Sequence, residues 1–116
     1  MRVFIEDSFD SAHWLPRVPE GHKCHRLHGH TYRLRIEIGG EVDPVSGWVV
    51  DYAEVKAIWD GVKPMLDHHC LNEVPGLSNP TCEIIAQWIS TYLADADLKV
   101  SRLELRETEH CGVVLE

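Results

Sequence analysis

The sequence lacks any hydrophobic stretch that could cross a bilayer. No apolar run approaches the roughly 20 residues that a membrane-spanning helix needs. The first ten residues, MRVFIEDSFD, also lack the apolar centre that a signal peptide carries. We therefore expect a cytoplasmic protein that has no membrane partner.

Basic residues and paired cysteines are also scarce. The 11 Lys and Arg residues are outnumbered by 19 Asp and Glu residues, and the formal net charge is −8. Because affinity for nucleic acid comes mainly from Lys and Arg, this balance argues against a nucleic-acid partner. The four cysteines stand at positions 24, 70, 82 and 111, and no two have CxxC spacing. A disulfide framework and an all-cysteine zinc site are therefore not expected.

The remaining composition is that of an ordinary globular chain. The 116 residues are 44% hydrophobic and 26% charged, which excludes disordered and fibrous classes. This length suits a single domain over residues 1–116. A chain of this size has a modest core, so we expect a homo-oligomer.

Hydrophobic periodicity predicts an α+β fold. Alternating residues predict strands over 2–14 and 28–42, and a turn at 43–47 followed by a short strand at 48–51 predicts a hairpin. Helical spacing predicts helices over 52–66 and 81–94, and a last strand covers 99–109, with 112–115 continuing it or following after a break. Runs of strands around paired helices favour an antiparallel sheet with both helices on one face.

Several of the eight histidines fall on inward-facing strand positions. His28 and His30 are two residues apart, so they share the face that carries the apolar residues of their strand. His13 has the inward parity of the first strand. If these strands are neighbours, three imidazoles converge, and three histidines with an open position are typical of catalytic zinc. The alternative is that they are hydrogen-bonded core or surface histidines.

Cys24 lies in the loop just before this histidine pair. Lys23, His25 and Arg26 surround it with potential positive charge, which favours the thiolate form. The thiol is then a candidate base or nucleophile. A solvent-exposed spectator or an additional metal ligand are the alternatives.

Two further candidate site positions involve a carboxylate. Asp67 precedes His68, and an adjacent carboxylate can orient an imidazole for acid–base work. The alternative is a histidine placed favourably at the end of a helix. Glu107 shares the inward parity of the last strand, where a carboxylate is unusual and could accept paired N–H donors from a heterocycle. The alternative is a strand-end charge that reaches solvent.

The candidate residues lie in six short segments spread along the chain: FDSAH (9–13), CHRLHGH (24–30), GWVVDY (47–52), LDHHCLN (66–72), NPTCE (79–83) and RET (106–108). Together these segments resemble the 6-pyruvoyltetrahydropterin synthase and 6-carboxytetrahydropterin synthase family. The resemblance runs almost end to end, and it is stronger to the 6-carboxytetrahydropterin synthase branch, which acts in queuosine biosynthesis.

The resemblance implies a tunnelling fold, in which a four-stranded antiparallel sheet carries two helices on one face. It also implies trimers that stack as hexamers. The implied reaction converts 7,8-dihydroneopterin triphosphate to 6-carboxy-5,6,7,8-tetrahydropterin, acetaldehyde and triphosphate. One alternative is a 6-pyruvoyltetrahydropterin synthase, which loses triphosphate only. The other is a non-catalytic module that binds zinc or pterin.

The resemblance also assigns roles to residues, which we list together. His13, His28 and His30 are implied Zn²⁺ ligands, Cys24 the catalytic thiol, Asp67 and His68 the proton-relay pair, and Glu107 the anchor of the pterin with Thr108 beside it. For the triphosphate, no motif identifies a binding residue. Arg17, Lys23 and Arg26 are candidates because an acidic chain needs local positive charge to bind this group.

Overall fold

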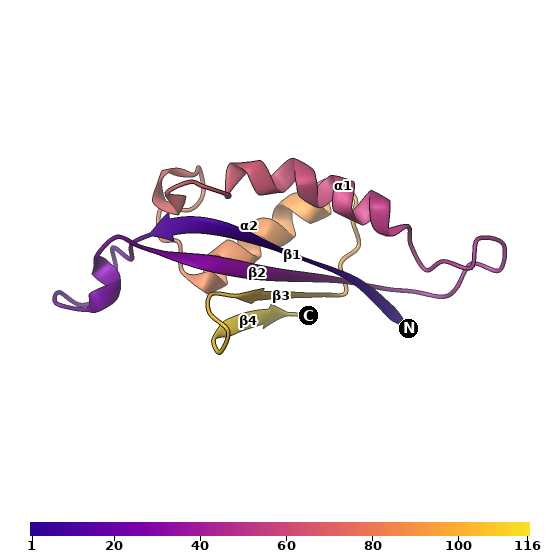
Figure 1. Cartoon of the computed structure of the whole chain (residues 1–116), viewed down its shortest axis with the longest axis horizontal. Coiled ribbons are helices and arrows are strands. Elements are labelled where there is room, and N and C mark those ends of the chain that lie inside the picture. The colour runs from indigo at the N-terminus through magenta and orange to yellow at the C-terminus, as the bar shows by residue number, and fades with distance from the viewer.

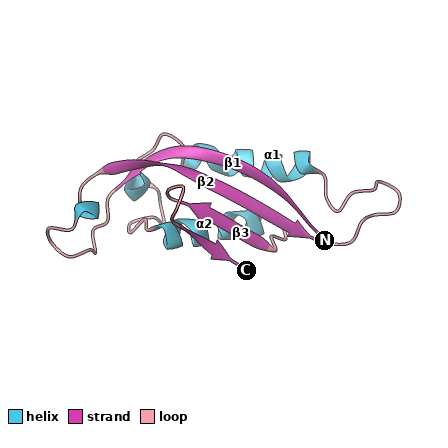
Figure 2. Ribbon diagram, turned by 60° about the horizontal axis from the view of Figure 1, so that its bottom comes forward, coloured by secondary structure: helices cyan, strands magenta, loops and turns pink.

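A four-stranded antiparallel sheet with two helices on one face makes up the computed structural model, which describes all 116 residues (Figures 1 and 2). The strands lie in the order β1 (Arg2–His13), β2 (His28–Gly39), β3 (Arg102–Arg106) and β4 (Gly112–Leu115). The helices are α1 (Tyr52–Val62) and α2 (Cys82–Asp95), and short 3₁₀ turns cover Lys23–His25, Lys63–Met65 and Leu71–Glu73. The predicted fold class is confirmed. No helix is long and apolar enough to cross a membrane.

The core lies between the helices and one face of the sheet. On β2, alternate residues from Tyr32 to Ile38 are buried, as the alternation in the sequence predicts. Helix α1 packs against β1, and α2 packs against β3 and β4. Helix α2 begins where the Thr81 hydroxyl accepts a hydrogen bond from the N–H of Ile84. This packing leaves the opposite face of the sheet without a helix.

Asp7 ties both α1 and the 3₁₀ turn after it to the sheet. Asp7 on β1 accepts hydrogen bonds from Trp59 Nε1 at 2.8 Å and Lys63 Nζ at 3.0 Å. Burial alone would raise the pKa of Asp7, but these hydrogen bonds hold it below the ordinary value of 3.8. The ionised carboxylate therefore stabilises the folded chain.

Replacing Asp7 by asparagine is expected to lower the free energy of unfolding at pH 7 by about 1–3 kcal/mol. Because the folded-state pKa is lowered, the contribution is present above pH 3.8 and is lost as the pH falls through the folded value. Denaturant titrations should show the two proteins converging as the pH is lowered into that range. Asp60→Asn, at an exposed pair with Lys56, is the control and should change little. A constant difference at all pH values would contradict the assignment.

The predicted strand at 48–51 is wrong, although the turn before it forms. The Asp43 carboxylate accepts hydrogen bonds from the N–H groups of Val45 and Ser46, and Gly47 has a positive φ of 77°. Residues 40–51 then project beyond the end of the sheet, where no strand lies beside them (Figure 1). Asp51 instead caps α1 by accepting a hydrogen bond from the N–H of Ala53.

The predicted last strand is too long at both ends. β3 ends at Arg106, where the chain turns and returns as β4, paired antiparallel with β3. The turn is held by the Thr108 hydroxyl, which accepts hydrogen bonds from the N–H groups of His110 and Cys111. Residues 112–115 therefore follow after a break rather than continue the strand. Helix α1 is shorter than predicted as well, because Pro64 cannot continue its hydrogen bonding.

Candidate metal centre and its surroundings

Strand register brings three histidines together at one end of the sheet. His13 on β1 is paired directly with His28 on β2, and His30 lies two residues further along β2. One ring nitrogen from each histidine lies within 4.8 Å of the others. His13 is fully buried, whereas His28 and His30 are half-buried. The convergence predicted from strand parity is confirmed.

Backbone carbonyls orient two of these rings. His13 Nδ1 lies 2.7 Å from the carbonyl oxygen of Pro80, and His28 Nδ1 lies 2.6 Å from that of Arg26. Because a carbonyl can only accept, each Nδ1 carries the proton and each Nε2 keeps a lone pair. Nε2 of both His13 and His30 is buried without a hydrogen-bond partner. His13 thus combines an unpartnered Nε2 with an anchored Nδ1, and the unpartnered Nε2 of His30 lies in the same group, which fits metal ligands.

Burial favours the neutral, metal-binding form of two of the histidines. It lowers the pKa of both His13 and His30, because a charged imidazolium is poorly solvated there. Neutral imidazole is the form that binds a metal ion. The position of the three ring nitrogens and the lowered pKa of two of them together suit a metal ion.

Glu107 lies beside the triad of its own chain. Its Oε1 atom is 3.3 Å from His30 Nε2, but the two atoms are not hydrogen-bonded. The residue follows directly after β3, and its N–H donates to the carbonyl of Cys111 at 2.9 Å. Its side chain is 27% exposed, so it can meet a ligand from solvent. Thr108 is exposed, and its hydroxyl oxygen accepts the turn's two hydrogen bonds.

The loop that carries Cys24 is closed onto the triad end of the sheet. Leu15 N–H donates to the carbonyl of Cys24 at 2.8 Å, and Arg26 provides the carbonyl that holds His28. Cys24 is half-buried on the short 3₁₀ turn and is not part of the metal-ligand group. His22 Nδ1 accepts a hydrogen bond from the N–H of Cys24, which gives this histidine a structural task.

Asp67 and His68 are fixed to the free edge of β1. The Asp67 carboxylate accepts from the N–H of Asp10 at 2.9 Å, and His68 N–H donates to the carbonyl of Asp10. Asp67 Oδ2 lies 3.1 Å from His68 Nδ1, so the predicted pair forms. The hydrogen bond from the Asp10 backbone holds the pKa of Asp67 below its usual range. His68 has a positive φ of 59° and is 78% exposed.

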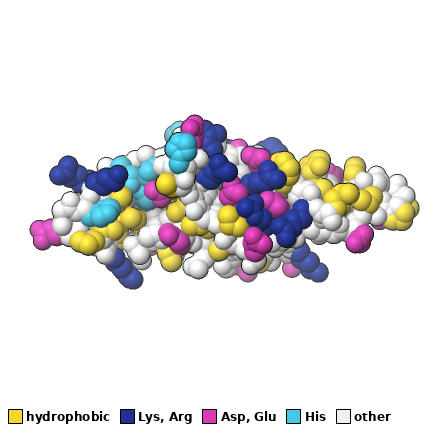
Figure 3. Space-filling model, turned by 90° about the horizontal axis from the view of Figure 1, so that it is seen from below, with side chains coloured by type: hydrophobic (Ala, Val, Ile, Leu, Met, Phe, Trp, Pro, Cys, Tyr) yellow, Lys and Arg dark blue, Asp and Glu magenta, His cyan; other side chains and the backbone are white.

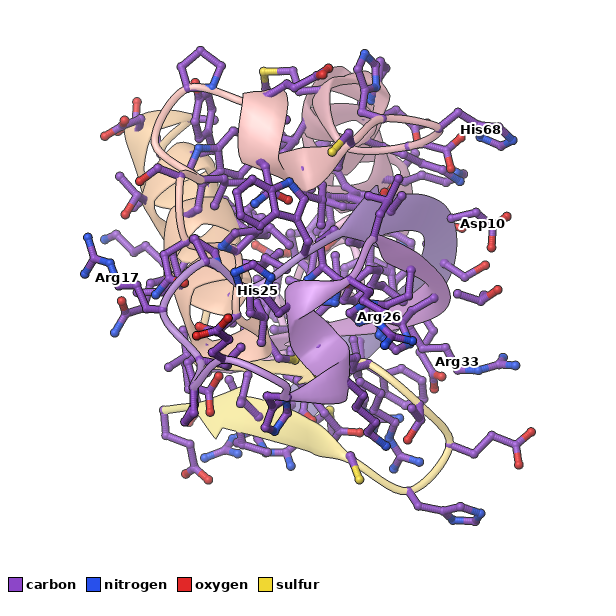
Figure 4. The ribbon with its side chains drawn as sticks, turned by 90° about the vertical axis from the view of Figure 1, so that its left-hand side faces the viewer. Asp10, Arg17, His25, Arg26, Arg33 and His68 are labelled. Atoms are coloured by element: carbon purple, nitrogen blue, oxygen red, sulfur yellow. The ribbon has the colours of Figure 1, made fainter.

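An open cavity of about 610 Å³ lies between His68 and the histidine triad. Its wall includes His30 from the triad, His68 from the pair, and Cys70. Figure 4 shows this end of the molecule, where His25 and Arg26 lie between the outward-pointing side chains of Arg17 and His68. Histidine side chains gather over the same half of the surface (Figure 3). Metal ligands, carboxylates and exposed cations therefore share one end of the sheet.

The chain is similar to known proteins over almost its whole length. Residues 2–116 match the family described as 6-pyruvoyl tetrahydropterin synthase. This chain belongs to that family. It is also similar to the solved structure of the 6-pyruvoyl tetrahydropterin synthase of Caenorhabditis elegans, with a TM-score of 0.89 and 25% sequence identity. The match covers 100% of this chain and 94% of that one.

Two curated relatives of this 6-pyruvoyl tetrahydropterin synthase family member differ in name. A dihydroneopterin monophosphate aldolase of Pyrococcus furiosus is 39% identical over 99% of this chain and 96% of its own length. A 6-carboxy-5,6,7,8-tetrahydropterin synthase of Synechocystis is 40% identical over 91% of this chain and 85% of its own length. The predicted family is confirmed.

Several groups around the histidines could not be identified from the sequence. The carbonyl oxygens of Pro80 and Arg26 orient two of the rings, and every residue type has such a carbonyl, so the sequence carries no signal for them. The sequence predicts only that Tyr32 faces inward, yet its hydroxyl lies 3.2 Å from His13 Nδ1. Asn72 stands in the LDHHCLN segment without a predicted role, although both the oxygen and the nitrogen of its amide are hydrogen-bonded.

Proposed function

We propose that the protein is a zinc-dependent 6-carboxytetrahydropterin synthase. The proposed reaction converts 7,8-dihydroneopterin triphosphate to 6-carboxy-5,6,7,8-tetrahydropterin with release of acetaldehyde and triphosphate. It serves queuosine biosynthesis. The coarser activity, a pterin-processing lyase, follows from family membership and from the named relatives. The metal, the pathway and the residue roles are the parts that we propose.

One observation carries the proposal: three imidazole nitrogens converge beside the half-buried Glu107 carboxylate. Three neutral histidines with room for a further ligand are typical of catalytic zinc rather than structural zinc, which has four protein ligands. The proposed ligands are His13, His28 and His30. Zinc bound there supplies a Lewis acid that favours loss of protons from the hydroxylated side chain of the substrate.

Proton transfer is assigned to Cys24 and to the Asp67–His68 pair. Cys24 accepts a proton from the substrate side chain as a thiolate. The hydrogen bond from the Asp10 N–H lowers the pKa of Asp67 and so favours its ionised form, and its Oδ2 atom lies 3.1 Å from His68 Nδ1. This contact fixes the imidazole and leaves Nε2 to give or take the second proton.

Substrate binding is assigned to the two ends of the centre. The Glu107 carboxylate can accept two N–H bonds from the guanidine-like edge of a pterin, provided that it turns away from His30. The Thr108 hydroxyl is still free to donate, since it only accepts within its turn. The exposed Arg17, Lys23 and Arg26 are the proposed partners of the triphosphate.

We further propose a trimer-based homo-oligomer, with a hexamer as the expected form. The sheet ends on β1 at one side and β4 at the other. Edge strands present unpaired N–H and C=O groups, which a neighbouring copy can pair. The 67–70 segment covers only part of the β1 edge, through the bridge between Ala12 and Cys70.

Product analysis tests the proposed reaction. Zinc-loaded protein given 7,8-dihydroneopterin triphosphate is expected to form carboxytetrahydropterin together with equimolar acetaldehyde, measured by mass spectrometry and an aldehyde assay. Removal of the metal by a chelator should stop turnover, and added zinc should restore it. A pyruvoyl product without acetaldehyde would identify the synthase alternative. No turnover by folded, zinc-loaded protein would favour a binding module.

A dihydroneopterin monophosphate aldolase is a second candidate, supported by the relative that is 39% identical over 99% of this chain. Retro-aldol cleavage of the three-carbon side chain would release a phosphorylated two-carbon aldehyde rather than acetaldehyde and triphosphate. The two reactions are therefore separated by giving the protein the monophosphate and the triphosphate in parallel. Turnover of the monophosphate alone, with the phosphorylated aldehyde as product, would replace the first proposal by the second.

A further inference from the structure

We propose that Asn72 is a positioning residue that holds the Cys24 loop against the metal-binding end of the sheet. The inference rests on the proposed function for the role of Cys24, but its structural part stands on contacts within this chain. Asn72 lies on the 3₁₀ turn Leu71–Glu73, which follows the segment that carries the Asp67–His68 pair. It is half-buried and lies outside the cluster of buried hydrophobic residues.

The Asn72 side chain binds both backbone groups of Trp14. Its Nδ2 atom donates to the carbonyl of Trp14 at 2.7 Å, and its Oδ1 atom accepts from the N–H of Trp14 at 3.0 Å. Two residues earlier on the same edge, Ala12 N–H donates to the carbonyl of His69 at 3.0 Å. The amide thus replaces a neighbouring strand at the point where β1 ends, and it fixes the chain on the far side of His13.

The clamped residue leads directly to the thiol loop. Leu15, next to Trp14, donates its N–H to the carbonyl of Cys24 at 2.8 Å. The Trp14 ring also lies edge-on to His25, with ring centroids 6.0 Å apart. A continuous series of contacts therefore runs from Asn72 through Trp14 and Leu15 to Cys24. Beyond Cys24, the carbonyl of Arg26 joins the loop to the ring of His28.

The residue type is specific to this task. Trp14 offers one donor and one acceptor, and only a primary amide presents the matching acceptor and donor from one side chain. An alanine would remove both bonds, and an aspartate would place an acceptor against the Trp14 carbonyl. Both changes leave the buried hydrophobic cluster intact, so we expect the loop to open without global unfolding.

Alkylation of the individual cysteines tests this inference without substrate. The zinc-loaded full chain is treated with iodoacetamide, and peptide mass spectrometry follows each thiol over time. Exposed Cys111 and buried Cys82 serve as internal controls for reagent activity and for unfolding. In Asn72→Ala, alkylation of Cys24 should rise at least about fivefold, the change in open population that loss of one net hydrogen bond gives. Cys111 and Cys82 should react as in the original chain.

Two further variants decide between positioning and general stability. Ser101→Ala removes a comparable side-chain bond, to the N–H of Gly39 at the far end of the sheet, and should leave Cys24 unchanged. Asn72→Asp keeps the size of the side chain and should expose Cys24 as alanine does, even if the alanine variant does not fold. Where the original chain turns over the triphosphate, both Asn72 variants should lose kcat by roughly 10- to 100-fold with little change in KM.

The outcomes separate this inference from the proposed function. An unchanged Cys24 alkylation rate in folded Asn72→Ala or Asn72→Asp would overturn the inference, whatever the activity. So would an equal rise in Ser101→Ala. A selective rise in Cys24 alkylation, in a chain that shows no pterin turnover, would support the clamp while refuting the proposed reaction.

Discussion

Replacing His28 by alanine is expected to abolish tight zinc binding while leaving the fold intact. The side chain is half-buried and lies outside the hydrophobic cluster, so its loss opens no large cavity. One of its ring nitrogens is nevertheless a corner of the three-nitrogen group. Loss of an outer-shell partner alone typically weakens metal binding by roughly 10- to 100-fold, and loss of a ligand should exceed this. Chelator competition and metal analysis of the purified protein measure the effect.

The matched control is His110→Ala. His110 is exposed in the turn between β3 and β4 and does not belong to the metal-ligand group. The His110→Ala variant should bind zinc as the original chain does. The circular dichroism spectra of the original chain and of both variants should be the same. Equal zinc affinity in the two variants would show that the triad is not the metal site, and the proposed function would lose the observation that carries it.

The fold was predictable where the side-chain pattern alone decides the structure. Alternation placed β1 and β2 and their buried faces, since one face of each strand packs under the helices. The failed strand at 48–51 shows the limit of this reasoning. Its residues have good strand propensity, but a strand needs a neighbour, and the Asp43 turn directs this segment beyond the sheet.

The triad was predictable because its geometry follows from parity and one strand pairing. His28 and His30 had to share a face, and antiparallel pairing with β1 brings His13 opposite His28. Only the inward parity of Glu107 was predictable, and it fits the contact with His30, since the first residue after β3 still follows the parity of the strand. The contacts between Asn72 and Trp14 were not predictable, because they depend on a loop meeting the end of a distant strand.

Replacing Cys24 by alanine is expected to reduce pterin turnover by roughly 10²- to 10⁴-fold, the usual contribution of a positioned proton-transfer group. Zinc content and folding should not change, because Cys24 is outside the metal-ligand group and its hydrogen bonds within the loop are made by its backbone. Steady-state kinetics on zinc-loaded protein measure the loss, and metal analysis of the same sample verifies the loading. The variant therefore separates proton transfer from metal binding.

Cys111→Ala provides the comparison that makes this result specific. Cys111 is an exposed thiol in the turn after Glu107, and its contacts to Glu107 and Thr108 use only its backbone carbonyl and N–H. Its removal should leave turnover unchanged, which excludes a general effect of losing a thiol. Full activity in Cys24→Ala would refute the catalytic role and leave the Asp67–His68 pair as the only assigned proton-transfer group. Loss of zinc together with activity would instead make Cys24 a metal ligand, a role that three converging imidazoles do not require.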